Sequence, residues 1–346
     1  MIVALVTLGA MWQAEVRVQL DAISDNVANL RGRTSAEVMA VVKADGYGHG
    51  AVPAARAALA GGASWLGVCT LAEALDLRTA GITSPVLAWL LAPGLPLHTG
   101  VEADIDLSAA SLRGLAEVVE AARVVGRQAR VHLKIDTGLT RGGAGAADWP
   151  ELVEAAAKAQ ADGTVDVVGV WSHFAYADAP GHPTIDRQIT LFREALVIAE
   201  RAGLAPRLRH LANSAATLTR PDAHFDLVRP GIAVYGLSPL AGRGAEFGLR
   251  PAMSVRARVL LAKRVRAGQG ISYGHTYVTE RETTVAVVPL GYADGLPRAA
   301  SGRGPIDLGG RRRTVAGRIC MDQLVLDCGD DPVAAGDVAV VIGNAP

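Results

Sequence analysis

Lys43 is the residue whose type and position most clearly suggest chemistry. It follows a short apolar run, residues 38–42, and precedes the glycine-rich segment ADGYGHG at 44–50. Only four of the 34 basic residues are lysines. A desolvated amine can lose its proton, attack a carbonyl and form a Schiff base, whereas a guanidinium stays protonated. The alternative is a surface lysine at a strand end, and the glycines around Tyr47 and His49 argue against it.

Polar side chains follow other apolar runs in the same way. They are Lys134 and Arg141 at or after the run 129–136, His173 at the end of 165–173, Asn213 and Ser214 after 208–213, and Arg229 within 227–235, where the glycine turn at Gly231 and Ile232 follows it. An amine, an imidazole, cations and small hydroxyls are the groups that an active site needs if these runs end at one edge of a sheet.

The elements that would position these groups alternate between strands and helices. Eight short apolar runs predict buried parallel strands, and Ala-rich segments between them predict helices. The strands are expected at 38–44, 65–70, 85–90, 101–107, 129–136, 165–173, 208–213 and 227–235, and the helices at 51–60, 71–80, 111–125, 149–161, 187–202 and 214–220. Eight such units favour a (β/α)8 TIM-type barrel over an open, doubly wound sheet.

The pattern of predicted elements changes after residue 240. Strand-like segments divided by Gly and Pro replace the helices, at 254–265, 283–289, 313–319, 323–327 and 338–342. The sequence therefore predicts an α/β chain with a barrel at 12–240 and a C-terminal all-β domain at 241–346.

In a barrel, the carboxyl ends of the strands form the active-site rim, and the loops after the last two strands often bind phosphate. A phosphate site at Ser214 and Gly231 together with the amine of Lys43 suits pyridoxal 5′-phosphate (PLP). Each residue also has a simpler reading: His173 as a core histidine, Arg141 in a salt bridge, Asn213 with Ser214 as a helix cap, and Gly231 in a turn.

Composition excludes several other classes of protein. The 346 residues carry 34 basic and 34 acidic side chains, so the formal net charge of zero predicts no nucleic-acid or membrane partner. Three cysteines without metal-ligand spacing indicate reduced thiols and no metal site. The apolar segment 1–11 is too short to span a membrane, and is read as a disordered or mis-called extension or as part of a first strand. A cytoplasmic location follows by elimination.

At these residues the chain resembles the alanine racemases, from about residue 14 to its end. VKADGYGHG at 42–50 is similar to their cofactor-lysine signature. Further similar segments follow in order: HLKIDTG at 132–138, RPGI at 229–232, ISYG at 271–274, GYADG at 291–295 and GRICMD at 317–322. The resemblance implies a PLP-dependent isomerase that interconverts L- and D-alanine, supplies D-alanine for peptidoglycan and acts as a homodimer with an active site shared between subunits.

The resemblance also implies roles for the candidate residues. Lys43 would carry PLP and act as the base on one face of the substrate. Tyr273 of the partner subunit would be the base on the other face. Two bases are needed because the proton leaves one face and returns to the opposite one. A phenol is a weak base at neutral pH, so nearby cations would have to favour the phenolate. His173 and Arg229 would connect to that site, with Arg229 facing the pyridine nitrogen.

The remaining roles concern binding. Arg141 would bind the substrate carboxylate, and Lys134 matches a lysine that is often carbamylated. Met321 would approach the substrate from the partner subunit. The residues expected to bind the cofactor or to support the site are Tyr47, Asn213, Ser214, Gly231, Ile232, Tyr292 and Asp322.

Two features depart from the family pattern. Family members usually continue beyond the position of residue 346 with a tyrosine that contacts the cofactor phosphate, so the β domain is expected to be truncated, with cofactor affinity weakened about ten- to a hundred-fold. Trp89 stands where many relatives have a smaller residue. The alternatives are a serine or broad-specificity racemase, a decarboxylase of the same fold type, for which no catalytic-cysteine context is found, and a non-catalytic PLP-binding relative.

Overall fold

The computed structural model describes residues 12–241 and 243–343, and its chain divides into two compact units. One unit is Leu20–Ala252, and the other combines the residues up to Gln19 with those from Met253 onward. The dividing point differs from the expected boundary after residue 240. Strand β1 (Ala14–Val18) also leaves the expected barrel range, because it pairs antiparallel with β10 (Met253–Arg258). Our reading of residues 1–11 lies outside the described residues.

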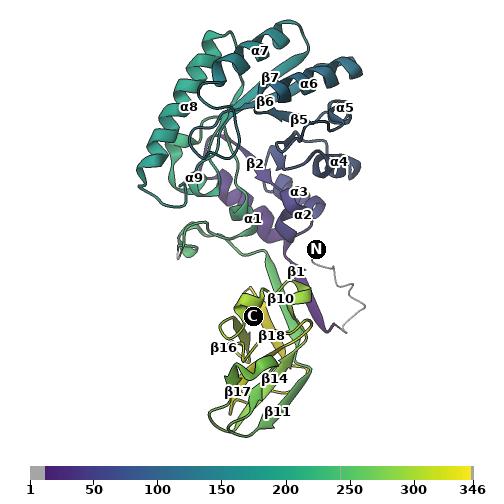
Figure 1. Cartoon of the computed structure of the whole chain (residues 1–346), viewed down its shortest axis with the longest axis vertical. Helices are drawn as coiled ribbons and strands as arrows, with labels where there is room; N and C mark the ends of the chain where they lie inside the picture. The colour runs from purple at the N-terminus through teal and green to yellow at the C-terminus, as the bar shows by residue number, and fades with distance from the viewer. Residues whose placement is uncertain (1–11, 242, 344–346) are drawn as a thin grey trace. The chain divides into compact units, whose positions relative to one another are not determined.

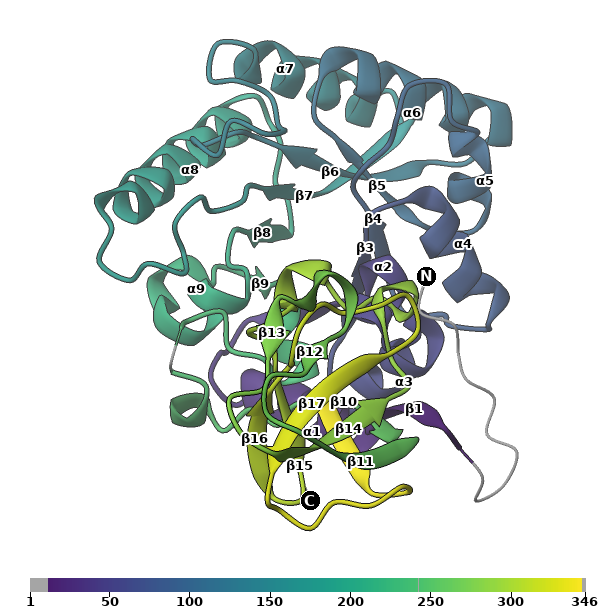
Figure 2. The ribbon, with the colours of Figure 1, turned by 60° about the horizontal axis from the view of Figure 1, so that its bottom comes forward.

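The unit Leu20–Ala252 is a parallel eight-stranded barrel, which confirms the predicted fold (Figures 1 and 2). Its strands follow the sheet order β8-β7-β6-β5-β4-β3-β2-β9. Backbone hydrogen bonds from Asp226 N to Arg209 O and from Arg229 N to Ala212 O join the two edge strands. The strands are β2 (Glu37–Val41), β3 (Trp65–Val68), β4 (Val86–Ala88), β5 (Asp106–Ala109), β6 (Ala129–Lys134), β7 (Val165–Trp171), β8 (Leu208–His210) and β9 (Leu227–Val228).

Helices surround these strands, as the ribbon in Figure 2 shows for α4 to α8. Local capping explains several of their starts: Thr70 and Glu73 form a capping box at α4, and the Ser111 hydroxyl accepts from Gly114 N at α6. The α-helices of this unit are α1 (Leu20–Arg31), the turn α2 (Lys43–Gly48), α3 (Ala51–Ala60), α4 (Leu71–Thr79), α5 (Leu97–Glu102), α6 (Leu112–Val125), α7 (Trp149–Ala161), α8 (Pro183–Arg201) and α9 (Ser214–Thr219).

The predicted strand at 101–107 was wrong; in the second unit, the strand predicted at 254–265 is divided into Met253–Arg258 and Leu261–Val265, and the one predicted at 313–319 overlaps only the end of Arg311–Thr314. The apolar run 101–107 is divided between the end of α5 and the start of β5, and Asp104 turns the chain between them with a φ of 56°. Leu97, Gly100 and Val101 form the buried side of the helix. A short apolar run does not distinguish a buried helix from a buried strand, which explains the error.

The second unit is all-β, as predicted, and it contains short 3₁₀ turns. It has a five-stranded sheet in the order β1-β10-β18-β15-β16, a three-stranded sheet β11-β14-β17 and a hairpin β12-β13. Their bounds are β11 (Leu261–Val265), β12 (Gly270–Ile271), β13 (Tyr277–Val278), β14 (Thr283–Val288), β15 (Pro305–Leu308), β16 (Arg311–Thr314), β17 (Leu324–Gly329) and β18 (Val338–Ile342). Ala257, Val288, Leu308 and Leu324 are buried in its core. Among residues 12–241 and 243–343, no helix is long and apolar enough to cross a membrane.

Candidate active site at the carboxyl rim of the barrel

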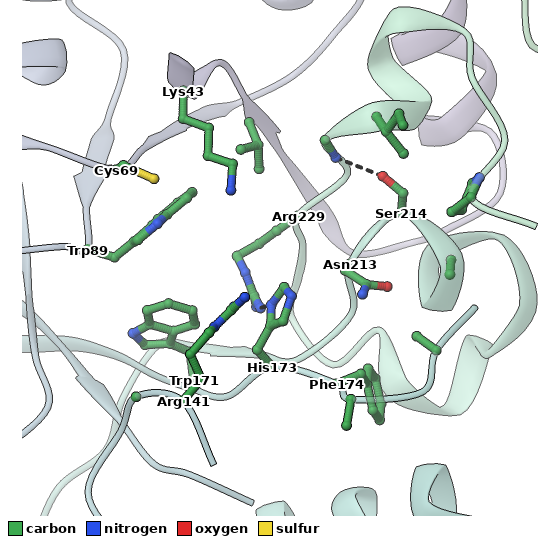
Figure 3. A pocket seen from close by; sticks show the side chains of 18 of the residues that line it. Lys43, Cys69, Trp89, Arg141, Trp171, His173, Phe174, Asn213, Ser214 and Arg229 are labelled. Atoms are coloured by element: carbon green, nitrogen blue, oxygen red, sulfur yellow. Dashed lines mark hydrogen bonds between the residues drawn. The ribbon is translucent and has the colours of Figure 1, made fainter. Parts of the chain in front are cut away.

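A cavity of about 660 Å³ opens at the carboxyl ends of the barrel strands (Figure 3). Ten residues that the sequence placed at strand ends line it together: Lys43, Tyr47, Lys134, Arg141, His173, Asn213, Ser214, Arg229, Gly231 and Ile232. Figure 3 shows Lys43, Arg141, His173 and Arg229 extending toward the same space from different strands and loops. The barrel thus joins groups that lie up to 189 residues apart, from Lys43 to Ile232.

A left-handed turn positions Lys43 and Tyr47. Four successive residues, 44–47, have φ between 51° and 61°, and only Gly46 among them is a glycine. This conformation is unfavourable for L-residues by roughly 1–2 kcal/mol each. Hydrogen bonds to flanking groups stabilise it: the Glu73 carboxylate accepts from Ala44 N at 2.7 Å, and Asp45 Oδ1 accepts from Ala51 N at 2.8 Å. Backbone strain of this kind is concentrated at functional sites.

Aromatic packing fixes the far side of the same turn. The Tyr47 and His49 rings lie 4.9 and 4.4 Å from the ring of Tyr235, measured between centroids. The Tyr235 hydroxyl donates to Val41 O at 3.1 Å, directly before the turn. The Lys43 amine lies 6.0 Å from the centroid of the Tyr47 ring, so both side chains face the cavity from one rigid segment.

Arg229 is a buried cation at the centre of the site, with a relative exposure of 4%. Its Nη2 atom donates to Ser172 O at 2.7 Å and lies 3.3 Å from His173 Nδ1, and its Nη1 atom lies 3.1 Å from His210 Nδ1. Burial lowers the pKa of Arg229 to about 9. The guanidinium is therefore still mostly protonated at neutral pH.

His173 is held neutral by this neighbour. Burial, followed by the charges of Arg229 and Arg141, lowers the pKa of His173 to about 3. Because a guanidinium only donates, His173 Nδ1 is the acceptor and its proton resides on Nε2. The reading of His173 as a core histidine does not account for its place in the cavity lining.

Lys134 lies among the same cations. Burial, then the charges of Arg229 and Arg141, lowers its pKa to about 8, and its amine lies 4.3 Å from the Trp171 ring centroid. Among the ion pairs of the described residues, none involves Lys43, Lys134, Arg141 or Arg229. Asp178 is the one acidic side chain among the described lining residues. The cavity therefore has an excess of positive charge that suits an anionic ligand.

Asn213, Ser214 and Gly231 form a wall of the cavity that consists of small side chains and backbone. Ser214 is the first residue of α9, and its hydroxyl accepts from Gly231 N at 2.8 Å and Ala233 N at 3.3 Å. Asn213 caps the helix by accepting from Ala216 N at 3.1 Å, so its expected cap role is observed. A Cβ atom on Gly231 would lie 2.3 Å from the Tyr47 hydroxyl, so only glycine allows this approach.

Four expected site residues belong to the β unit and share one part of its surface. Tyr273, Tyr292 and Met321 are 71%, 40% and 58% exposed, and Asp322 is exposed as well. Met321 O accepts from Ala293 N at 2.8 Å, which joins the loops that hold Met321 and Tyr292. Ser272, next to Tyr273, donates to Arg318 O at 2.7 Å and so joins the third loop.

The sequence reasoning missed Trp171 and Asp178 as lining residues. Trp171 lies two residues before His173 in the expected strand, so both side chains are expected on the same face of the strand. This spacing could have identified Trp171 as a lining residue. Asp178 comes from the loop before α8, whose path cannot be derived from a sequence pattern.

A parallel barrel with a cationic cavity at its carboxyl rim, joined to an all-β unit, is the architecture of a two-unit barrel enzyme. Residues 18–239 match the model for the alanine racemase N-terminal domain, and residues 252–346 match the model for the alanine racemase C-terminal domain. The chain belongs to the alanine racemase family.

Individual relatives agree with this assignment. The chain is 73% identical to "Alanine racemase" of Salinispora arenicola, over 96% of this chain and 89% of that protein, and 59% identical to that of Thermobifida fusca, over 95% and 88%. The crystal structure of alanine racemase from D-cycloserine-producing Streptomyces lavendulae superposes with a TM-score of 0.95 at 55% identity, over 97% of this chain and 89% of that one. The Corynebacterium glutamicum structure gives 0.85 at 40%, over 96% and 90%.

Proposed function

We propose that this chain interconverts L- and D-alanine with PLP as its cofactor and thereby supplies D-alanine for peptidoglycan. The observation that carries the proposal is the cavity itself, in which Lys43 shares the barrel rim with the buried Arg229 and with the Ser214–Gly231 wall. Relatives that are 50–73% identical and carry the name alanine racemase support the choice of reaction.

The residues present fit PLP. Ser214, Gly231, Ile232 and Tyr47 would hold the phosphate, where backbone N–H groups and hydroxyls converge and a Cβ atom on Gly231 would collide with Tyr47. Lys43 would attach the cofactor, and Arg229 would face its pyridine nitrogen. When bound, PLP supplies an electron sink that makes the substrate α-hydrogen acidic enough to be removed.

The chain's own groups would then move the proton. The amine of Lys43 removes or returns the α-hydrogen on one face, and the hydroxyl of Tyr273 from a partner subunit does so on the other face. Racemisation needs both groups, because each can reach only one face of the substrate α-carbon once that carbon is planar. His173 is neutral and accepts from Arg229 through Nδ1. Its Nε2–H group would donate on the side of the site where Tyr273 acts, and so would connect Arg229 with Tyr273.

Arg141 would bind the alanine carboxylate, and Lys134 would hold Arg141. We propose that Lys134 does so as a carbamate, formed when its neutral amine adds to carbon dioxide and releases a proton. The pKa of about 8 supports this proposal, since a substantial neutral fraction exists near neutral pH. A carbamate would also place a negative charge among the three remaining cations, Lys43, Arg141 and Arg229.

The exposed face with Tyr273, Tyr292 and Met321 supports a homodimer in which each subunit contributes these residues to its partner's site. Asp322 lies beside them and would support that contact. The cytoplasmic location stays a prediction, which the three free cysteines support.

The test is chiral analysis of L-alanine after incubation with the purified chain and PLP. Formation of D-alanine that depends on Lys43 would establish racemisation. L-serine and other amino acids assayed in parallel would distinguish an alanine racemase from a broad-specificity one. Bound PLP without any racemisation would instead indicate a non-catalytic relative.

A further inference from the structure

A continuous chain of polar side chains crosses the interior of the barrel and ends on Arg229. Arg130 donates to both carboxylate oxygens of Asp106, at 2.7 and 3.1 Å. Asp106 Oδ2 lies 3.0 Å from His132 Nε2, and His132 Nδ1 lies 2.9 Å from His210 Nε2. The last link is the 3.1 Å contact between His210 Nδ1 and Arg229 Nη1.

The position of these residues on the strands gives the chain a direction. Asp106 is the first residue of β5 and Arg130 the second of β6, near the amino ends of the strands. His132 lies in the middle of β6, and His210 is the last residue of β8. The chain thus reaches from the amino-terminal end of the barrel to the carboxyl rim where Arg229 lines the cavity.

Hydrogen-bond chemistry also sets the proton positions. Arg229 has no acceptor, so His210 Nδ1 accepts and the His210 proton is on Nε2. That proton is donated to His132 Nδ1, which places the His132 proton on Nε2 and directs it to Asp106. Although burial opposes ionisation, the bonds from His132 and Arg130 hold the pKa of Asp106 below its usual value. Burial and the charge of Arg229 hold the pKa of His210 well below its usual value.

The surrounding core is adapted to these side chains. Asp106, His132 and His210 are at most 1% exposed, in a position where barrels commonly pack branched aliphatic residues. Gly169 of β7 makes room, since a Cβ atom there would lie 2.5 Å from His132 Nδ1. The Trp171 ring stacks on His210 with an interplanar angle of 1°, and the Arg229 guanidinium carbon lies 4.9 Å from the centroid of the Trp171 ring. Aliphatic replacements would give an equally buried core, so stability alone does not explain these polar groups.

We propose that Asp106, His132 and His210 are positioning residues that orient Arg229 toward the cofactor ring through a one-directional row of hydrogen bonds. The proposal rests on the proposed function, because it assigns Arg229 to the pyridine nitrogen. It adds three residues that touch neither substrate nor cofactor, and the sequence motifs around Lys43 and Arg229 do not include Asp106 or His210.

The test compares His132→Leu with Val168→Ala. His132→Leu removes the acceptor of the His210 Nε2 proton, so the His210 ring loses the hydrogen bond that fixes its orientation toward Arg229. Val168→Ala removes apolar volume from the same barrel interior and leaves every side chain of the polar chain in the sequence. Asp106→Asn is the milder variant, since the amide keeps one acceptor oxygen and removes the charge. The readouts are PLP dissociation constants by equilibrium dialysis, 15N shifts of the imidazole nitrogens, and kcat and KM for alanine.

In the wild-type protein the 15N shifts are expected to show neutral His132 and His210, each protonated on Nε2. His132→Leu is expected to leave the His210 proton on Nε2 but without an acceptor, and to weaken PLP binding about ten-fold or more, with a loss in kcat larger than the change in KM. Val168→Ala is expected to change PLP affinity by less than about two-fold, which is the ordinary effect of a substitution without a shared partner. Asp106→Asn should fall between them.

Protons on Nδ1 in the wild-type protein, or equal effects of His132→Leu and Val168→Ala on PLP affinity, would overturn the proposal. The 15N and binding measurements do not depend on turnover. If the wild-type protein binds PLP and fails to racemise alanine, the proposed function fails while the positioning role is still decided. If His132→Leu does not fold, Asp106→Asn and the wild-type tautomers decide it.

Discussion

His173 Nδ1 lies 3.3 Å from a guanidinium nitrogen of Arg229, and burial together with this cation keeps the imidazole neutral. His173 follows the end of β7 and Arg229 follows the end of β9, and the two residues meet at the barrel rim. The charge of His173 is therefore nearly independent of pH in the range where histidine usually titrates. The contact with Arg229 also fixes which His173 nitrogen can donate into the cavity.

The first prediction concerns pH and stability. The pKa of His173 is about 3 in the folded protein, against 6.5 for a free imidazole. Below about pH 6.5 the unfolded chain takes up a proton that the folded protein does not, so this group makes folding less favourable as pH falls. The loss is at most about 1.4 kcal/mol per pH unit. Chemical denaturation between pH 7 and 5 should show this slope, and His173→Gln should have a shallower one. An unchanged slope would contradict the shift.

The second prediction concerns Lys43. Lys43→Ala and Lys43→Arg are expected to abolish racemisation and covalent attachment of PLP, since neither side chain offers a nucleophilic amine. Mass spectrometry after borohydride reduction should locate the PLP adduct on the Lys43 peptide. Lys158→Ala, on the exposed side of α7, is the matched control and should leave both properties unchanged. An adduct on another lysine would refute the assignment.

The third prediction concerns the cavity wall formed by Ser214 and Gly231. Gly231→Ala would place a Cβ atom 2.3 Å from the Tyr47 hydroxyl, so either Tyr47 or the backbone at Gly231 must move. PLP affinity should fall by about ten-fold or more, in the range expected when a charged group loses a hydrogen bond. Gly114→Ala in α6 is the control, because its Cβ would make an ordinary 3.5 Å contact. Equal affinities in titrations of the two variants would show that the wall does not hold the phosphate.

The fourth prediction concerns Lys134. Its pKa of about 8 means that the neutral amine, which is the form that reacts with carbon dioxide, increases between pH 7 and 9. A carbamate signal from 13C-labelled carbon dioxide is expected in the wild-type protein and should be lost in Lys134→Arg. The variant should also have a raised KM for alanine, because Arg141 would lose its anionic partner. Absence of the signal at pH 8 to 9 would exclude the carbamate.

The fifth prediction concerns the shared site. Lys43→Ala and Tyr273→Phe should each be inactive alone. After subunit exchange, mixed dimers would contain one intact site, and up to about half the wild-type rate per heterodimer should return if two equal sites act independently. Native mass spectrometry would confirm that mixed dimers formed. Mixed dimers without activity would show that Tyr273 and Lys43 do not act across subunits.

The sequence alone was sufficient to predict the alternation of strands and helices and the rim residues of the barrel, although it did not predict α1 and α5. Buried parallel strands produce continuous apolar runs, and the fold carries their carboxyl ends to one edge, so the polar residue after each run could be named. The prediction was wrong at 101–107, where helix and strand share one apolar run. It placed residues 14–18 with the barrel, whereas β1 pairs with β10 far along the chain.

Other features depended on tertiary contacts. The left-handed turn at 44–47 is unfavourable locally and exists because Glu73, Asp45 and Tyr235 stabilise it. The neutrality of His173 and the lowered pKa of Lys134 arise from burial next to Arg229, which is 56 and 95 residues away in the sequence. The row from Asp106 through His210 depends on the register between strands. Local patterns determine which residues reach the rim, whereas strand register and burial decide which atoms meet and which of them carry charge.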